Sequence, residues 1–153
     1  MKTNIPVKYE YRLKGEISLE TTTGNSTKNQ NVTEEIDQSD VALRAFFGIA
    51  KVWGLNTEEQ IALLGKPARS TYFKWKKSSG QLSKDTLERV SYLLGIFKAL
   101  EILFPDAKSA DAWIRRHNDA PLFNGQSALD RMLAGSVSDL FVVRRYLDAQ
   151  RGG

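Results

Sequence analysis

The feature that most constrains the fold is a long apolar stripe in the middle of the chain. Between Ser83 and Pro105, apolar residues recur at every third or fourth position, and they are Leu87, Val90, Leu94, Phe97, Leu100 and Phe104. This spacing puts them on one face of an α-helix, for which Ser83 is an N-cap and Pro105 a stop. A face of that size has to be buried, so we expect the rest of the fold to pack around this helix.

Helix signals also precede this stripe. A first helix is predicted over residues 40–54, because the apolar spacing there is helical and ends at a glycine. A second helix begins at Thr57, which we expect to form a capping box with Gln60, and ends at Gly65. A third helix starts within residues 67–70, where a proline suits the first helical turn.

Further helix signals follow the stripe. Residues 109–116 are predicted to be helical, residues 118–125 to form a loop, and a short helix then ends at Gly135. The last helix begins at Ser136, with Asp139 at the capping-box position. The pattern as a whole predicts an all-α fold.

Three regions are expected within this fold. Residues 1–40 are interpreted as a flexible arm or a segment that a partner orders, because residues 21–31 are polar and nearly free of apolar side chains. Within this arm, apolar residues alternate over residues 7–13, which is typical of one short strand. Residues 41–105 are predicted to form one helical domain and residues 106–153 a second.

The residue inventory argues against several classes of protein. The chain has no cysteine, which excludes a disulfide framework, a thiolate metal site and a cysteine nucleophile. No segment has the length and apolarity of a signal peptide or a membrane span. We therefore expect a soluble protein of the cytoplasm that has no membrane partner.

Catalysis and metal binding are not expected either. His117 is the only histidine, and the chain has no glycine-rich phosphate loop or serine-nucleophile motif. Asp106, Asp111 and Asp119 are the carboxylates that could accompany His117, but helix capping explains them equally well. The sequence predicts no enzyme, no metal site and no cofactor.

Basic residues gather just before the apolar stripe. The formal net charge is +4, and the basic residues from Lys66 onward meet no acidic residue before Asp85. Two short helices joined by a glycine-containing turn, the second of them basic, are typical of a helix-turn-helix that reads the major groove of DNA. Tyr72 and Trp75 then face inward. The residues expected to contact operator DNA are Arg69, Ser70, Thr71, Lys74, Lys76 and Lys77.

The alternative is a helical hairpin whose lysines are merely solvated. Ile61 stands where a helix-turn-helix usually has a small residue, and Pro67 lies in the turn. Both features also fit a helix-turn-helix that is kept for assembly rather than for DNA binding.

The C-terminal part of the chain resembles a known family. Its markers are a tryptophan, an Asn and Pro turn, a Gly and Ser helix start, a Leu and Gly helix end, and an arginine-containing last helix; they are Trp113, Asn118, Pro121, Gly125, Ser127, Leu133, Gly135 and residues 144–147. These markers resemble the toxin-binding domain of the Xre/MbcA/ParS antitoxins, although Ala128 stands where proline is common. Residues 43–105 resemble the Xre-type helix-turn-helix domain that precedes it in such antitoxins.

This resemblance implies a function. It implies an antitoxin of a type II toxin-antitoxin system that neutralises an RES-domain toxin, an enzyme that consumes NAD. It also implies that the protein represses its own operon by binding operator DNA. Two alternatives stay open: a stand-alone helix-turn-helix transcription regulator without a toxin partner, and an interaction protein that no longer reads DNA.

The end of the chain is the toxin-binding site that the resemblance suggests. The residues expected there are Phe141, Arg144, Arg145, Tyr146, Leu147, Arg151, Gly152 and Gly153. Guanidinium groups bind carboxylates and phosphates bidentately, which suits a hypothesis in which this end covers the dinucleotide pocket of the toxin. In the alternative, Phe141 and Leu147 close the chain's own core and the arginines cap the last helix.

A homodimer is also expected, because operators read by such proteins tend to be two-fold repeats. Leu87, Leu94 and Phe97 exceed what a single core needs, so we expect them at the dimer interface.

Overall fold

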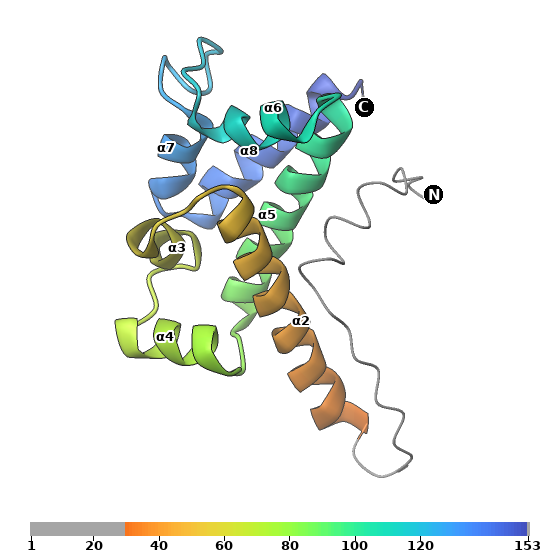
Figure 1. Ribbon diagram of the computed structural model, residues 1–153, viewed down its shortest axis with the longest axis vertical. Coiled ribbons are helices and arrows are strands. Elements are labelled where there is room, and N and C mark those ends of the chain that lie inside the picture. The colour runs from red at the N-terminus through yellow and green to blue at the C-terminus, as the bar shows by residue number, and fades with distance from the viewer. Residues whose placement is uncertain (1–29, 153) are drawn as a thin grey trace.

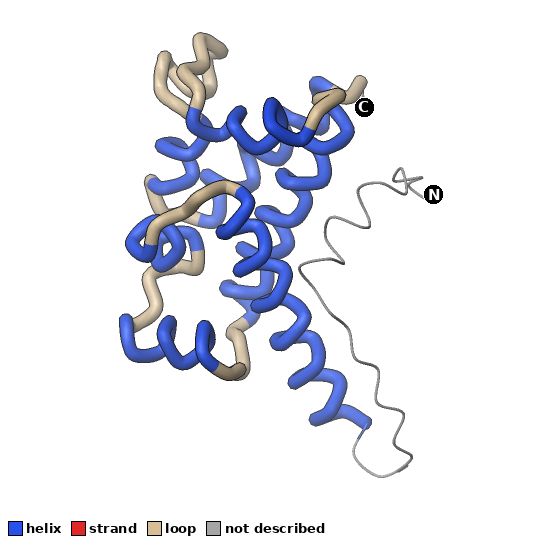
Figure 2. Tube along the Cα trace, in the orientation of Figure 1, coloured by secondary structure: helices blue, strands red, loops and turns tan. Residues whose placement is uncertain are grey.

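The computed structural model describes residues 30–152. All the secondary-structure elements named in this part of the chain are helices. In chain order the helices are α2 (Gln30–Val52), α3 (Thr57–Leu63), α4 (Arg69–Lys77), α5 (Lys84–Leu103), α6 (Ala107–Ala112), the short 3-10 helix η1 (Trp113–Arg115), α7 (Ala128–Leu133) and α8 (Val137–Gln150). The longest non-helical stretch within these residues is 116–127, a loop between η1 and α7 (Figure 2). The predicted all-α fold is confirmed for the described residues.

Helix α5 lies at the centre of the fold, between α2 on one side and α8 on the other (Figure 1). Leu93, Ile96 and Leu100 of α5 are almost fully buried there. One continuous apolar core includes residues of α2, such as Phe46, together with residues of α8, such as Leu140. The regions before and after residue 105 therefore share a core instead of each having its own.

The ends of α5 and α8 confirm the capping signals read from the sequence. The Ser83 hydroxyl accepts a hydrogen bond from the backbone N–H of Thr86, and α5 ends at Leu103, just before Pro105. At the start of α8, the Ser136 and Asp139 side chains form the expected capping box. These are local interactions, which is why a short stretch of sequence is enough to predict them.

The N-cap of α3 differs from the prediction. Asn56 caps the helix instead of Thr57, and its side-chain oxygen lies 2.8 Å from the backbone nitrogen of Glu59. Glu59 completes the capping box by accepting from the Asn56 N–H. Gln60, the predicted partner in this capping box, is buried instead and bonds to Tyr72 and Leu55.

The first helix starts earlier than predicted, at Gln30 instead of Asp40. Residues 30–47 contain neither glycine nor proline, so nothing in the sequence breaks the helix there. Ser39, which was assigned to the flexible arm, is only 2% exposed, and its hydroxyl accepts a hydrogen bond from the Leu82 N–H. The expected short strand over residues 7–13 lies outside the described residues.

One residue expected at a dimer interface belongs to the core. Phe97 is 2% exposed, and its ring centroid lies 6.1 Å from that of Trp53 in the loop after α2. Leu87 and Leu94 are half-buried. The prediction for Phe97 is wrong because α8 and the end of α2 together cover more of α5 than its sequence alone reveals.

Of the helices that the structure describes, none combines the length and the apolar character that a membrane span requires.

Candidate functional site

The basic helix α4 follows α3 after a short turn and presents one face to solvent. Tyr72 and Trp75 are buried, as the spacing of the two aromatic residues predicts. Of the six residues expected to contact DNA, Thr71 is half-buried and the others are exposed. We call these six residues, Arg69, Ser70, Thr71, Lys74, Lys76 and Lys77, the α4 surface.

A buried pair of hydrogen bonds fixes α4 against α3. The Tyr72 hydroxyl donates to Gln60 Oε1 over 2.6 Å, and Gln60 Nε2 donates to the carbonyl oxygen of Leu55 over 2.8 Å. Burial raises the pKa of Tyr72, so the phenol stays a neutral donor at physiological pH. This chain of bonds sets the position from which the α4 surface faces outward.

The turn between α3 and α4 is supported from behind by α5. Gly65 has φ +92° and Lys66 has φ +59°, a left-handed pair that reverses the chain. The side chain of Arg89 lies over this turn and pairs with Asp85 at 2.9 Å. A Cβ atom at Gly65 would come within 2.9 Å of Arg89 Nε. The backbone angle therefore favours glycine there, and any larger residue would also have to displace the Arg89 side chain.

The cations of the α4 surface differ in how they are held. Arg69 pairs with Glu58 of α3, and its guanidinium carbon lies 5.7 Å from the centroid of the Phe73 ring. Within residues 38–152, no carboxylate lies at ion-pair distance from Lys74, Lys76 or Lys77. The three lysines are thus available to phosphate groups, whereas Arg69 has to leave Glu58 to contact a base.

Two of the residues expected to contact a partner lie on the buried side of α8. Leu147 is 1% exposed and belongs to the core. Tyr146 is half-buried in an aromatic cluster, stacked on Trp113 with ring centroids 6.3 Å apart and set edge-on to Phe123 at 5.1 Å. For Leu147 the alternative interpretation, closure of the chain's own core, describes what the structure shows.

The outer side of α8 is accessible. Phe141 is 41% exposed, and the Arg145 guanidinium lies 5.7 Å from the centroid of its ring. A shallow open pocket of about 650 Å³ lies beside them, lined by Leu122, Val142, Arg145, Tyr146, Asp148 and Ala149. We call this region, Phe141 and Arg145 with the pocket, the α8 surface.

The remaining predicted partner residues lie on another flank of α8 or at its end. Arg144 bonds to both carboxylate oxygens of Asp148 through Nε and lies across Gly95 of α5. Arg151 ends the helix, and Gly152 follows it with φ +85°. Gly153 lies outside the described residues.

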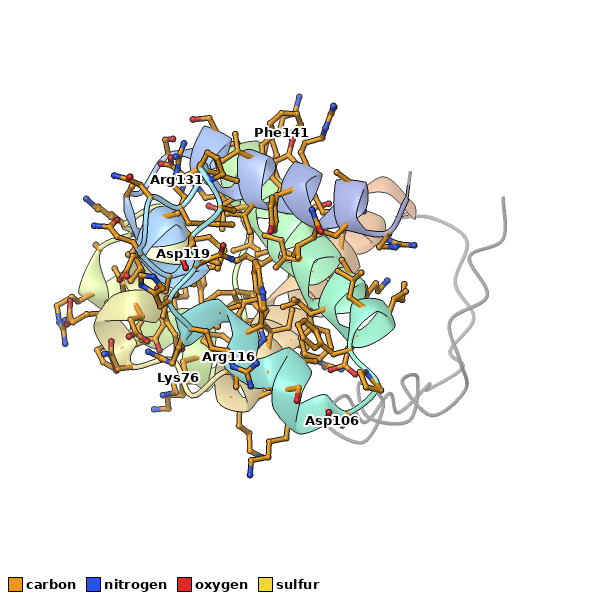
Figure 3. The ribbon with its side chains drawn as sticks, turned by 90° about the horizontal axis from the view of Figure 1, so that it is seen from above. Lys76, Asp106, Arg116, Asp119, Arg131 and Phe141 are labelled. Atoms are coloured by element: carbon orange, nitrogen blue, oxygen red, sulfur yellow. The ribbon has the colours of Figure 1, made fainter. Side chains whose placement is uncertain are left out.

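The α4 and α8 surfaces lie apart on the molecule. Figure 3 labels Phe141 of α8 at the top of that view and Lys76 of α4 at its lower left.

An ion pair that sequence reasoning missed joins the two halves of the chain. Arg115 of η1 bonds to both carboxylate oxygens of Glu59 in α3 and to the carbonyl oxygen of Gly54. The hydrogen bond from Arg115 is the main reason why the pKa of Glu59 lies below its usual value. The two residues are separated by 56 positions, so no local pattern signals this contact.

His117 lies in a solvent-exposed loop. Its Nε2 atom is 2.5 Å from Asp119 Oδ1, and both side chains are largely exposed. Asp106 caps α6 by accepting from the Ser109 N–H, as helix capping predicted. Within the described residues, no group of three or more His, Cys, Asp or Glu side chains is placed to hold a metal ion.

Comparison with known proteins finds a family match for each half of the chain. Residues 34–95 match the antitoxin Xre-like helix-turn-helix domain, and residues 99–153 match the C-terminal toxin-binding domain of the antitoxins Xre, MbcA and ParS. The two matched regions meet inside α5. The chain is also 60% identical, over 111 residues, to the uncharacterized protein y4oB of Sinorhizobium fredii; the aligned part covers 72% of this chain and 84% of that protein.

Proposed function

This chain belongs to the family of Xre-type antitoxins, and from that premise we propose that it neutralises an NAD-consuming RES-domain toxin and represses its own operon. The observation that carries the proposal is the order of the two matched domains, a helix-turn-helix followed directly by a toxin-binding domain. Neither domain belongs to an enzymatic family, so inhibition is proposed to work by occlusion and not by chemistry.

For DNA binding, the proposal uses the α4 surface. Lys74, Lys76 and Lys77 neutralise phosphates of the operator, which releases counterions and makes the affinity depend on salt. Ser70 and Thr71 donate hydrogen bonds to phosphates or bases. Arg69 exchanges Glu58 for a guanine or a phosphate.

For toxin binding, the proposal uses the exposed residues near the C-terminus. Phe141 provides an apolar anchor, and Arg145 provides a cation beside it, a combination that is common at the centre of protein interfaces. Tyr146 lines the adjacent pocket with its exposed edge. Arg144, Arg151, Gly152 and Gly153 complete the side of the protein that covers the toxin's dinucleotide pocket. Leu147 supports this surface from the core.

A homodimer in the cytoplasm is proposed as the form that binds DNA. A two-fold operator presents two half-sites and therefore favours two copies of α4. Leu87 and Leu94 are the half-buried apolar residues of α5 that we propose for contact with the second copy.

The proposal is tested by measuring cellular NAD and growth while the gene adjacent to this one is expressed. We expect NAD to collapse when the neighbour is expressed alone and to recover when this chain is expressed with it. A double variant, Phe141→Ala with Arg145→Glu, is expected to fail to restore NAD. Lys108→Glu, at an exposed position of α6, is the control and restores it.

Two results would count against this function. If the product of the adjacent gene is harmless, or if NAD never changes, that gene does not encode an NAD-consuming toxin. A stand-alone transcription regulator would then be favoured. Full protection by the double variant would remove the α8 surface from the toxin contact.

A further inference from the structure

A second pocket, of about 300 Å³, lies between α5 and α8. Its lining residues are Ser91, Leu94, Gly95, Lys98, Ile102, Arg144 and Arg151. They lie between residues 91 and 102 of α5 and between the middle of α8 and its C-cap, and Figure 1 shows α4 at the opposite end of the molecule from the C-terminal end of α5. A DNA duplex bound to the α4 surface therefore does not account for this pocket.

Arg144 is fixed in this pocket by two features of the fold. Its Nε atom lies 3.1 and 3.0 Å from the two carboxylate oxygens of Asp148, which orients the guanidinium group. The guanidinium then lies against the backbone of α5 at Gly95, where a Cβ atom would come within 1.4 Å of Nη1. Only glycine at position 95 leaves room for this arrangement.

The terminal nitrogens of Arg144 have no hydrogen-bond acceptor among the side chains and backbone that the structure describes. Asp148 binds only Nε, and no hydrogen bond joins either Nη atom to residues 38–152. Arginine donates through a planar fork that matches the oxygens of phosphate and carboxylate groups. A guanidinium that is oriented by Asp148 but left with unused donors is a preorganised receptor for an oxyanion.

The charge of the pocket also favours an anion. Lys98, Arg144 and Arg151 are three cations, and among the side chains of residues 38–152 Asp148 is the one carboxylate paired with them. Within the described part of the chain, Lys98 has no ion-pair partner. The excess positive charge is sufficient to neutralise a doubly charged group.

We propose that this pocket binds the phosphate group of a small phosphorylated ligand. The Arg144 fork and the Lys98 ammonium hold the phosphate oxygens, with the exposed Ser91 hydroxyl as a further donor. Leu94 and Ile102 form an apolar rim for the organic part of the ligand, and the volume lies at the small end of ligand pockets. Phosphate is favoured over a single carboxylate because it offers three oxygens and a second negative charge to the three cations.

This inference goes beyond the proposed function and is tested on the chain without its toxin, but the pocket shares Leu94 with the proposed dimer contact and Arg144 and Arg151 with the proposed toxin contact. The ligand would contact α5 and α8 at once, on a different flank of α8 from the pocket of the α8 surface. A bound ligand would thus stabilise the packing of α8 on α5.

The experiment is calorimetric titration of the full chain with AMP, inorganic phosphate, adenosine and succinate at constant ionic strength. AMP and phosphate are expected to bind, adenosine is not, and succinate is expected to bind more weakly than phosphate. Lys98→Gln is expected to weaken AMP about tenfold, because it removes one charge-assisted hydrogen bond. Gly95→Ala, which displaces Arg144, is expected to weaken AMP at least as much.

Arg145→Gln is the matched control, since it removes the same charge from the neighbouring position of α8 without touching the pocket. It should change AMP affinity by less than about twofold, as expected of a charge outside the site. Circular dichroism confirms the fold of each variant. Failure of both AMP and phosphate to bind at millimolar concentration would overturn the proposal. Equal losses in Lys98→Gln and Arg145→Gln, or tighter binding of succinate than of phosphate, would overturn it as well.

Discussion

Arg115 holds both carboxylate oxygens of Glu59, at 3.2 and 2.9 Å, although the two residues lie in different matched domains. Glu59 also accepts the N–H of Asn56 in the capping box of α3, and Arg115 donates to the carbonyl oxygen of Gly54. One carboxylate thus caps a helix of the helix-turn-helix domain and anchors the toxin-binding domain to it.

The Arg115 and Glu59 pair predicts a pH-dependent loss of stability. The pKa of Glu59 is lower in the folded chain than in the unfolded chain, where it is near 4.5. The contribution of the Glu59 carboxylate to the free energy of unfolding is therefore fully present above pH 4.5 and is lost as the pH falls through the pKa of the folded chain. Glu59→Gln is expected to cost about 1 kcal/mol of unfolding free energy at pH 7 and much less at pH 3. Urea unfolding at both pH values measures the difference. Glu58→Gln, which affects only an exposed pair, is the control, and an equal cost in both variants would contradict the assignment.

A second prediction concerns the buried hydroxyl of Tyr72. Tyr72→Phe leaves Gln60 Oε1 without its donor in a buried site, which is expected to cost about 1 to 3 kcal/mol. Tyr92→Phe removes a hydroxyl that bonds to the exposed Glu88 over 3.3 Å, and is expected to cost less than about 0.5 kcal/mol. Denaturant unfolding compares them. Similar costs for both variants would show that the bond to Gln60 does not stabilise the contact between α3 and α4.

Third, the α4 surface is tested by the salt dependence of operator binding. Replacing Lys74, Lys76 and Lys77 with alanine is expected to lower the slope of log affinity against log salt by about 2 to 3, since each phosphate contact contributes about 0.9. Lys108→Ala, on α6, should leave the slope unchanged. Fluorescence anisotropy with operator DNA at several salt concentrations gives the slopes. An unchanged slope in the triple variant would assign DNA contact to another part of the chain.

The fourth prediction separates the two sides of α8. Leu147→Ala removes a fully buried side chain and is expected to cost about 2 to 5 kcal/mol of unfolding free energy. Phe141→Ala is expected to cost less than about 1 kcal/mol, because its side chain is already partly exposed, and yet to weaken toxin neutralisation. Thermal unfolding and NAD recovery, measured on both variants, distinguish a stability effect from a contact effect. If Leu147→Ala loses neutralisation but Phe141→Ala keeps it, Phe141 does not contact the toxin.

Sequence alone predicted the features that depend on neighbouring residues. The apolar stripe of α5, the Ser83 cap and the Ser136 capping box all follow from spacings of four residues or fewer. Asn56 and Thr57 are both good N-caps, and the choice between them depends on where α3 must sit so that Gln60 meets Tyr72. The local pattern allows both frames, Asn56 with Glu59 and Thr57 with Gln60, and the packing of Gln60 against Tyr72 accompanies the first.

The candidate sites were predicted less completely for the same reason. The exposure of the lysines on α4 follows from the phase set by Tyr72 and Trp75. On α8, by contrast, Phe141 and Leu147 have similar chemistry, and only the position of α5 decides which of them is buried. Arg144 and Gly95 also come together only through the packing of these two helices.

The position of the domain junction within α5 limits how the two domains can be exchanged in evolution. The match to one domain ends at residue 95 and the match to the other begins at residue 99, so the junction falls within a single helix whose side chains at Ile96 and Leu100 are almost fully buried. A recombination event at this junction would join a new C-terminal half to a helical face shaped for the old one. In the proposed function, operator choice and toxin choice are therefore linked through the shape of α5, and a change of toxin partner is expected to be easiest by substitutions on the outside of α8.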